Sequence, residues 1–463
     1  MKRNKFLVGA GACVLLCAVA LSNIGISSVH AADTERAVDR LGKDLTPVGA
    51  ERAGNADGLI PEWTGGYQGQ PEGYAPGIPF FDIFPEDKVQ FTITRDNAAQ
   101  YADRLTAGEL ALLDKVPNFR MPVFQSRRSC GFDQEIYDAF AANARTAKLV
   151  DNGNTVTGSR ITSPFPIPNN GLEVMWNHLL RRSGYKMKGG VASAAVNRDG
   201  SYSLVRSYME MINHYSGPST PALEDLSDGV LSIVFVEAVA PPSRAGELVL
   251  NYSPINRQKD PRQLWVYAPG ERRVRRAPDV GYDTPAANTD GQITDDQLDG
   301  FNGAPDRYEW DLRGKKEIYI PYNSYRIHSH GLKYSDFLIP GTVNPDYMRY
   351  ELHRNWVVEA KLKKGESHIY PRRIFYFDED GWSMSTSESY DDNDELWRVN
   401  YMGLMHFYGI PACLSTIIVN HDLRNGRYVA LDLDNEEEAF DWYADELTDD
   451  MFTASQLRRR GTR

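Results

Sequence analysis

Two histidines offer the first possible chemistry, because imidazole is a common metal ligand. His328 and His330 are separated by one serine. On a β-strand, residues two apart project from the same face, so both rings would be available to one metal ion. Neither cysteines nor a carboxylate cluster adjoin them in the sequence to complete a ligand set. Polar strand or loop residues are the favoured interpretation, and we expect no metal site and no cofactor.

A run of arginines is the second candidate. Arg272, Arg273, Arg275 and Arg276 surround a single valine on a predicted strand of an acidic protein. Guanidinium groups bind carboxylates and phosphates, so these four residues are candidate contacts for a partner protein or an anionic headgroup. Two alternatives stay open at this point: a charged edge strand that resists aggregation, or pairing with the chain's own carboxylates.

Signatures of the common enzyme classes are missing from the sequence. It contains no Gly-x-Ser-x-Gly, no Cys-x-x-Cys, no His-Glu-x-x-His and no glycine-rich phosphate loop with Lys-Ser or Lys-Thr. Each of these motifs brings together groups that a particular reaction needs. We therefore expect no catalytic residues and no enzyme activity, with an envelope hydrolase as the minor alternative.

The elements that must position these residues change character at about residue 190. From there, short β-rich runs alternate between two faces and are separated by turn signals. Linkers this short join antiparallel strands, since a parallel crossover needs a dozen or more residues. The predicted strands are 191–196, 201–212, 231–239, 247–252, 263–267, 272–276, 356–362, 368–377, 382–389 and 396–401.

One face of these strands is broadly aromatic and aliphatic. Residues two apart share a face, as Phe375 and Phe377 do. A second sheet would bury such a face, whereas a curved sheet would use it to line a cavity around inserted helices. Each residue taken alone is readily explained as core. The candidate ligand-lining residues are Trp265, Tyr267, Trp356, Val358, Phe375, Phe377, Trp382 and Met384.

The region before these strands divides into an arm and a helical part. Residues 32–91 are rich in glycine and proline, and their aromatic side chains predict an extended arm that lies on the body. Capping-box pairs, Thr106 with Glu109 and Asn170 with Glu173, predict two helix starts, and a further helix is predicted over 134–149. We assign 92–185 as a helical region packing on the sheet, 186–463 as the sheet region, and 32–463 as one enlarged domain.

The first 31 residues have the composition of a cleavable signal peptide. Three basic residues precede an apolar run over 6–21, and small residues lead to a cleavage site near Ala31. A membrane anchor is the alternative, although this run is short for a bilayer span. Cys13 and Cys17 lie in the run without the surroundings of a lipidated cysteine, so we expect no lipid anchor.

Charge argues against one class of partner. The full chain has 51 basic and 63 acidic residues, a net charge of −12, and removing the three basic residues of the signal peptide leaves 48 against 63, or −15. Phosphate backbones bind basic surfaces, so we expect no nucleic acid as a partner. Beyond residue 31 no apolar stretch approaches membrane length, and we expect a mature protein that is soluble in the periplasm of a Gram-negative cell.

Two cysteines remain after signal cleavage, Cys130 and Cys413. In an oxidising compartment a disulfide between them is favoured over the alternative of two free thiols. Such a bond would close a very long loop and stabilise the fold by about 5 kcal/mol in the chain-entropy description.

Long motifs occur in order between about residues 45 and 450. They are Ala53-Gly-Asn-Ala-Asp-Gly with Trp63-Thr-Gly-Gly, Pro164-Phe-Pro-Ile-Pro with Trp176-Asn-His-Leu-Leu, Leu264-Trp-Val-Tyr-Ala-Pro-Gly-Glu, Phe301-Asn-Gly-Ala-Pro-Asp, Gly314-Lys-Lys-Glu-Ile-Tyr-Ile-Pro and His353-Arg-Asn-Trp-Val-Val-Glu-Ala. On these motifs the chain resembles a bacterial family catalogued as domain of unknown function 1329, often described as outer-membrane lipoprotein-sorting-like. Motifs of this length are specific for a family and much less so for a function.

The resemblance implies an α+β fold like that of the lipoprotein carriers of the Lol pathway. The expected form is a curved antiparallel β-sheet, an incomplete barrel, with helices on or in its concave face and an extended N-terminal arm. The resemblance carries no catalytic residues. The chain is about twice as long as the simple carriers, and its arm would be able to occupy the cavity that a ligand would use.

The resemblance also implies partner proteins, because such proteins resemble periplasmic proteins that work with resistance-nodulation-division permeases and with outer-membrane proteins. We therefore expect a periplasmic carrier or adaptor for a lipid or another hydrophobic molecule, working with an inner-membrane export permease. The alternative is a structural or assembly partner of a permease or outer-membrane protein that carries nothing and uses the arm and Arg272–Arg276 as contacts.

Overall fold

The computed structural model describes residues 37–278 and 281–462. The predicted signal peptide, residues 1–31, lies outside these ranges. Among the helices within them, none is both long enough and apolar enough to cross a membrane.

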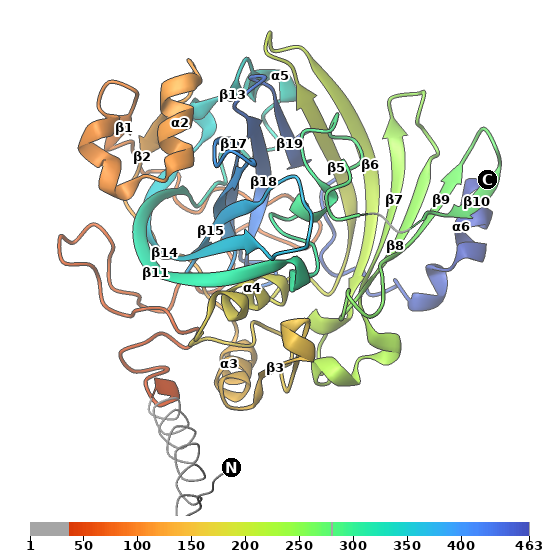
Figure 1. The fold of residues 1–463 in the computed structure, drawn as a ribbon, viewed down its shortest axis with the longest axis horizontal. Helices are drawn as coiled ribbons and strands as arrows, with labels where there is room; N and C mark the ends of the chain where they lie inside the picture. Colours follow the sequence, from red (N-terminus) through yellow and green to blue (C-terminus); the bar gives the residue numbers. More distant parts are fainter. Residues whose placement is uncertain (1–36, 279–280, 463) are drawn as a thin grey trace, which may run out of the picture.

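One large sheet dominates the fold (Figure 1). Its fifteen strands follow the order β1-β2-β14-β15-β16-β17-β18-β19-β5-β6-β7-β8-β9-β10, and β11 also pairs with β14. Neighbouring strands are antiparallel, apart from one parallel pair that joins β2 to β14 at Val123 and Tyr350. The order runs from β1 to β10 without a pairing between these two ends, so the sheet curves but does not close into a barrel. This confirms the predicted fold class.

The strands of the main sheet include a counterpart of every predicted strand, with ends shifted by up to about six residues, and five strands that were not predicted, β1, β2, β11, β18 and β19. Their bounds are β1 Phe91–Ile93, β2 Met121–Val123, β5 Lys186–Val196, β6 Tyr202–Asn213, β7 Val230–Ala240, β8 Leu248–Pro254, β9 Gln263–Ala268, β10 Arg273–Arg276, β11 Tyr308–Pro321, β14 Tyr350–Leu362, β15 Arg372–Asp378, β16 Met384–Tyr390, β17 Leu396–Phe407, β18 Ala412–Asp422 and β19 Tyr428–Leu433. Two ribbons stand apart, β3 Lys148–Val150 with β4 Thr155–Thr157 and β12 Leu338–Ile339 with β13 Thr342–Val343.

The helices begin where the capping residues predicted. Helix α2 (Ala107–Lys115) starts with the complete capping box of Thr106 and Glu109. Helix α4 (Gly171–Leu179) starts after Asn170, whose side chain accepts a hydrogen bond from the Glu173 amide. Helix α3 (Gln134–Thr146) ends before the predicted residue 149, because 148–150 form β3 instead. The remaining helices are α5 (Tyr334–Phe337) and α6 (Ala454–Gly461).

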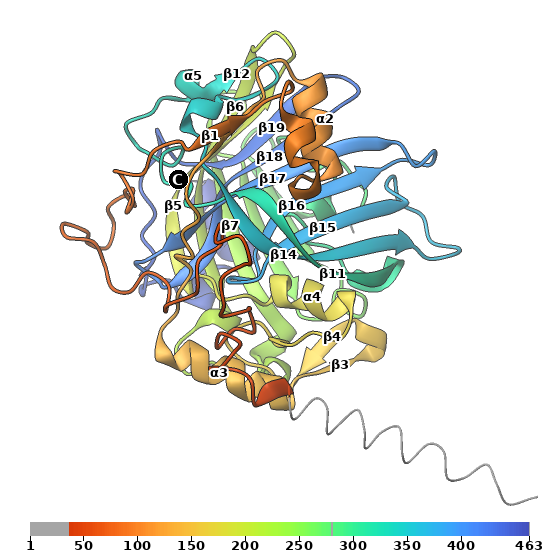
Figure 2. The same ribbon diagram turned by 90° about the vertical axis from the view of Figure 1, so that its left-hand side faces the viewer.

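Helices cover both faces of the sheet, as Figure 2 shows with α2 on one side of β14–β18 and α3 and α4 on the other. The face toward α3 and α4 forms an apolar core with the segment 286–301. The opposite face forms a second core with α2 and residues 327–348. Strands β18 and β8, five places apart in the sheet, line one cavity on the α4 side, so this is the concave face.

The arm packs against the body in the part that the structure describes. Residues 39–90 form turns and isolated bridges rather than strands or helices. Phe80 is buried in a cluster with Tyr325 and Tyr408. The indole nitrogen of Trp382 donates a hydrogen bond to the carbonyl of Val48 at 3.1 Å. Aromatic contacts of this kind explain why an irregular segment carries so many large apolar side chains.

Candidate functional site

A cavity of about 460 Å³ lies on the concave face. Its walls come from strands β5–β8, from β18 and β19, from α4 and from the segment 298–305. Trp176 and Leu179 of α4 face it, which places the helix predicted from Asn170 and Glu173 directly over the site. Strand and helix walls of this kind are typical of small-molecule pockets in curved sheets.

Two cross-strand rows of side chains continue from this cavity over β6–β9, and we call them the concave rows. Directly paired residues of neighbouring strands lie on the same face, so register defines each row. The first row is Met187, Met211, Val234, Asn251 and Leu264, and the second is Met209, Val236, Val249 and Val266. Met187 is buried, and the other side chains of both rows are partly buried.

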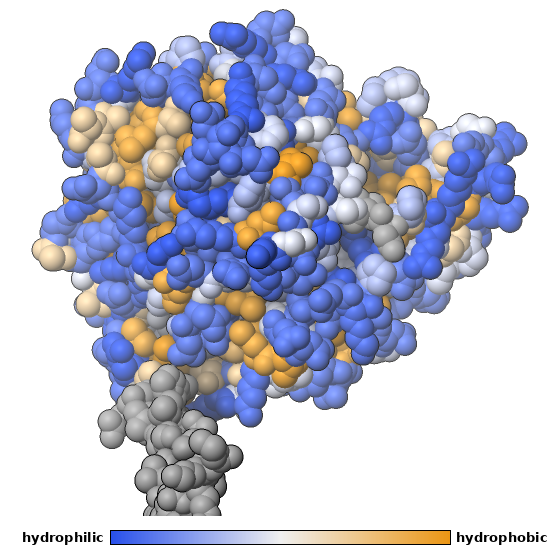
Figure 3. All heavy atoms as spheres, viewed as in Figure 1, coloured by the Kyte–Doolittle hydropathy of each residue, from blue (hydrophilic) through white to orange (hydrophobic). Residues whose placement is uncertain are grey.

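The opposite face of the same strands is covered. Ile233, Phe235 and Leu250 alternate with the concave rows and are buried in a cluster with Leu457 of α6. Helix α6 therefore covers the outer face of these strands, and the inner apolar face stays partly open. Figure 3 shows apolar atoms in the hollow beside β7–β10, at the right of the view. A partly exposed apolar surface that continues across several neighbouring strands is typical of a binding surface.

Charged groups stand at the edges of the cavity. Arg181 donates two hydrogen bonds to Asp299, at 2.7 and 2.8 Å. Asp432 also lines the cavity, and its side chain is exposed there. Desolvation by the cavity walls, with Asp299 nearby, raises the pKa of Asp432 to about 7. A carboxyl group in a site this apolar is stabilised in its neutral form.

A second, more open groove of about 740 Å³ lies under the arm. Its walls are the loop residues 78–82, 325–326, 329–332 and 346–347. We favour the concave cavity as the functional site, because regular strands and a helix hold its walls while loops alone hold the groove.

Sequence comparison agrees with the fold. A model of the family described as Protein of unknown function (DUF1329) matches residues 92–458. The chain belongs to the DUF1329 family. It is also 40% identical, over 471 aligned residues that span all of both chains, to Uncharacterized protein PA3922 of Pseudomonas aeruginosa.

Two solved structures are similar to this DUF1329 chain. One is a DUF1329 family protein from Desulfovibrio piger, with 16% identity, a TM-score of 0.40, and coverage of 59% of this chain and 92% of that one. The other is LolA superfamily protein NE2245 from Nitrosomonas europaea, with 14% identity, a TM-score of 0.38, and coverage of 62% and 98%. At identities this low the likeness says nothing about ligands.

The eight predicted ligand-lining residues lie in two cores of the DUF1329 chain. Val358, Phe375, Phe377, Trp382 and Met384 are fully buried in the concave core, and Trp356 packs against it. Tyr267 is buried with α6 on the outer face, and Trp265 packs beside it. In the structure as described, none of the eight lines the cavity, because α4 and 286–301 cover the first group and α6 covers the second. A lining role for them stays a prediction.

The four arginines lie at the free edge of the sheet. Arg272, Arg273, Arg275 and Arg276 are all exposed on or beside β10. Arg275 is paired in register with Val266, so its side chain stands at the end of the second concave row. It also forms an ion pair with Glu271, as one alternative anticipated. Contact with a partner stays a prediction for these residues.

His328 and His330, the pair considered as metal ligands, make contacts with protein groups. His328 lies 2.9 Å from a carboxylate oxygen of Asp434 and 2.7 Å from the hydroxyl of Thr416. His330 stands edge-on to it, with ring centroids 6.0 Å apart.

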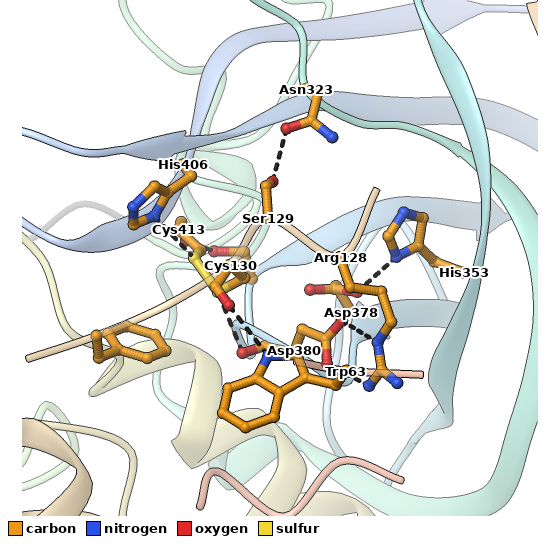
Figure 4. Close-up of a disulfide and its surroundings, with 12 residues drawn as sticks. Trp63, Arg128, Ser129, Cys130, Asn323, His353, Asp378, Asp380, His406 and Cys413 are labelled. Carbon is orange, nitrogen blue, oxygen red and sulfur yellow. Dashed lines mark hydrogen bonds and ion pairs between the residues drawn. A yellow bond between two sulfur atoms is a disulfide. The ribbon is translucent and has the colours of Figure 1, made fainter. Parts of the chain in front are cut away.

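A different group, His353, Asp378 and Asp380, has the spacing of metal ligands, with donor atoms within 4.8 Å of one another. Arg128 occupies both oxygens of Asp380, at 2.6 and 2.9 Å (Figure 4). Burial, followed by the charges of Asp380 and Glu379, raises the pKa of Asp378 well above its usual value and favours a neutral carboxyl. We interpret the group as a buried ion-pair network.

The predicted disulfide is confirmed. Cys130 and Cys413 are bonded, with Cα atoms 5.8 Å apart, directly beside the network around Arg128 (Figure 4). The indole nitrogen of Trp63 donates to the Cys130 carbonyl at 3.4 Å, so the arm also meets the sheet here.

Sequence reasoning missed the residues that form the cavity. One signal was present: Met209 and Met211 recur at period two in a predicted hairpin, on the face opposite Ile212. Methionine is adaptable and recurs on surfaces that bind varied apolar partners. The charged residues around the cavity, such as Arg181 and Arg257, carried no local signal because they come from loops far apart in sequence.

Proposed function

We propose that this DUF1329 protein binds a lipid or another hydrophobic molecule on its concave face and acts as a carrier or adaptor in the periplasm. The observation that supports it is the pair of concave rows, whose apolar side chains stay partly open beside a cavity of about 460 Å³. Apolar surface left in water costs about 25 cal/mol per Å², and a bound apolar molecule removes that cost. The volume lies within the range of small-molecule sites.

The arm leaves this cavity available. The wall residues that the structure describes begin at Asn154, so residues 37–90 do not contribute to it. The arm packs instead on the end of β17, on the start of β18 and around the disulfide. A ligand would therefore not have to displace the arm from the site.

Two substitutions on the concave rows test the proposal. Val234→Glu and Met211→Glu place a charge on the apolar wall and should weaken binding of the fluorescent probe N-phenylnaphthylamine at least tenfold. Val239→Glu is the matched control, because Val239 lies on the same strand with 56% of its surface exposed, and it should bind as the wild type does.

Native mass spectrometry of the mature protein, purified from the periplasmic fraction and incubated with phosphatidylethanolamine, gives an independent readout. Lipid adducts should appear on the wild type and on Val239→Glu and be lost from Val234→Glu. A wild-type protein that takes up neither probe nor lipid would contradict the proposal.

The cellular setting is part of the proposal. The signal peptide supports export to the periplasm, where the N-terminal residue of the mature chain should be Ala32 by N-terminal sequencing. Transfer of an apolar molecule across that compartment would be a natural task beside a resistance-nodulation-division-type permease, and in-cell crosslinking of the mature protein would reveal such a partner. Recovery of the uncleaved chain in the membrane fraction would argue for an anchored protein instead.

The alternative is a non-carrying assembly partner, which the exposed arginines of the β10 edge favour. Replacing Arg272, Arg273, Arg275 and Arg276 by alanine distinguishes the two functions. Loss of partner capture with N-phenylnaphthylamine binding intact would favour the assembly role. Unchanged capture, together with loss of binding in Val234→Glu, would favour the carrier.

A further inference from the structure

Three arginines line the cavity, and they differ in how their charge is balanced. Arg181 faces Asp299, as described above, and Arg262 pairs with Asp295 at 2.6 Å. Arg257 instead donates to the amide oxygen of Asn302 at 2.6 Å. Among residues 37–278 and 281–462, no carboxylate forms an ion pair with Arg257.

An unbalanced guanidinium in an apolar wall is costly. Burial, reinforced by the charge of Arg262, lowers the pKa of Arg257 to about 10. The group stays charged at neutral pH and is partly buried; its hydrogen bond goes to a neutral acceptor, and Asp295 acts on it only from a distance. A charge that has lost part of its water and has no direct ion pair is less stable than a paired one. An anion in the cavity would remove this penalty.

Arg257 also stands at a junction. With Arg262 and Asn302 it lines a second recess of about 290 Å³, which Arg307 and Tyr282 share. On the other side, the same three residues border the main cavity with its apolar strands. These three residues therefore border both the apolar cavity and a recess that carries a further guanidinium group. Arginine is well suited to phosphate and carboxylate oxygens.

We propose that Arg257 binds the anionic headgroup, a phosphate or a carboxylate, of an amphipathic lipid whose apolar chains lie against the concave rows. This inference rests on the proposed carrier function and adds the class of ligand to it. Arg262 supports the headgroup from beside Arg257 while keeping its own partner Asp295. Asn302 holds the guanidinium in place.

The test compares two lipids with identical acyl chains, phosphatidylglycerol and phosphatidylcholine, in equilibrium binding by native mass spectrometry. The wild type should prefer phosphatidylglycerol at least tenfold. Arg257→Ala and the larger polar variant Arg257→Gln should lose this preference for phosphatidylglycerol. Arg95→Ala is the matched control, since Arg95 is an exposed arginine whose side chain is 72% accessible, and it should keep the preference. Circular dichroism melting of each variant checks that it is folded.

The outcomes separate this inference from the function on which it rests. Equal binding of both lipids by the wild type, or an unchanged preference in folded Arg257→Gln, would overturn headgroup recognition and leave the carrier intact. Binding of inorganic phosphate that Arg257→Ala abolishes, without any lipid binding, would show a site for free phosphate and overturn both. A wild type that binds no lipid, no probe and no phosphate would also overturn both.

Discussion

Arg128 shows at the residue scale how a single side chain ties the arm to the sheet. Its guanidinium donates to both oxygens of Asp380 and to the carbonyls of Glu51 and Arg52, with only 2% of the side chain exposed. Residues 51–52 of the arm are thus held against a buried charge pair. A buried ion pair of this kind fixes geometry more than it adds stability, but removal of the arginine leaves the Asp380 carboxylate buried without its partner.

Replacing Arg128 by methionine should therefore lower the free energy of unfolding by about 3–5 kcal/mol, because the buried Asp380 carboxylate would lose both of its hydrogen bonds to this guanidinium. Urea unfolding followed by circular dichroism measures the change. Arg95→Met, at an exposed ion pair, should cost less than about 1 kcal/mol. A loss below 1 kcal/mol for Arg128→Met would mean that the network reorganises around the gap.

Glu109 makes stability depend on pH. Burial raises the pKa of this carboxyl to about 8, while the amide of Thr106 donates to it at 2.8 Å. The native state then binds a proton that the unfolded chain releases above pH 4.5, so stability is greatest in acid and falls as pH rises toward 8. The slope should approach about 1.4 kcal/mol per pH unit.

Glu109→Gln keeps an acceptor for the Thr106 amide but cannot ionise. We expect it to match the wild type at pH 5 and to unfold at higher urea concentration at pH 8. Glu135→Gln, on the exposed side of α3, should show no such difference. Identical pH profiles for Glu109→Gln and the wild type would contradict the assignment.

At the residue scale, the sequence predicted roles correctly where the partner is close in sequence or where only one partner is available. The capping boxes needed only residues three apart, and the disulfide was predicted from the two cysteines that lie outside the predicted signal peptide. The ligand-lining residues could not be predicted in the same way. Phe375 and Val234 both read as apolar strand positions, and only the segment 286–301, distant in sequence, buries one and leaves the other partly open.

Helix α6 decides, at the scale of elements, which side of β6–β9 stays open. Leu457 is its buried anchor, 2% exposed, against Ile233 and Phe235. Without this helix both sides of the four strands would present apolar side chains to water. The concave rows would then compete with the outer face for any apolar ligand.

Leu457→Ala should reduce the free energy of unfolding by about 2–3 kcal/mol, since it removes buried methyl groups and leaves a cavity. It should also raise the binding of N-phenylnaphthylamine, because the outer face becomes reachable when α6 loosens. Arg459→Ala, exposed on the same helix, is the control for both readouts. Wild-type stability in Leu457→Ala would show that α6 does not hold this face.

The elements that the sequence predicted are those with local partners. In hairpins such as β5–β6, alternating apolar residues and a short turn at 198–200 together predict both strands from one local stretch of sequence.

Strand β19 pairs with β5, more than two hundred residues earlier, and was not predicted. Strand β11 carries Lys315, Lys316 and Glu317 in its middle, which hides its alternation. Helix α3 was predicted too long because residues 148–150 form β3, which the Asn152-Gly153 turn, with both residues at positive φ, joins to β4.

The curvature of the whole molecule lay beyond sequence reasoning from the residues alone. It depends on how fifteen strands twist together and on which segments fill the inside. The resemblance to the DUF1329 family supplied the expectation of an incomplete barrel, whereas alternation within strands predicted only antiparallel pairing. The division of the concave face into a filled part and an open part came from the structure.

The disulfide acts on the molecule as a whole, since it joins residues 283 positions apart. Reducing it should lower the free energy of unfolding by about 5 kcal/mol in the chain-entropy description. Both sulfur atoms belong to buried residues, so dithiothreitol should act only as the protein unfolds. Urea midpoints with and without reductant measure the effect, and Cys130→Ser with Cys413→Ser should reproduce the reduced value. Equal midpoints would contradict a stabilising role.

The same bond turns most of the chain into a covalent ring. Helices α3 and α4 and strands β5–β9, which carry the concave rows, all lie between Cys130 and Cys413. A protease that cuts any one loop within the ring would leave a single molecule, with two new ends and the sheet still paired. In the proposed periplasmic setting, the concave rows inside such a ring would survive one proteolytic cut that would divide an open chain into two fragments.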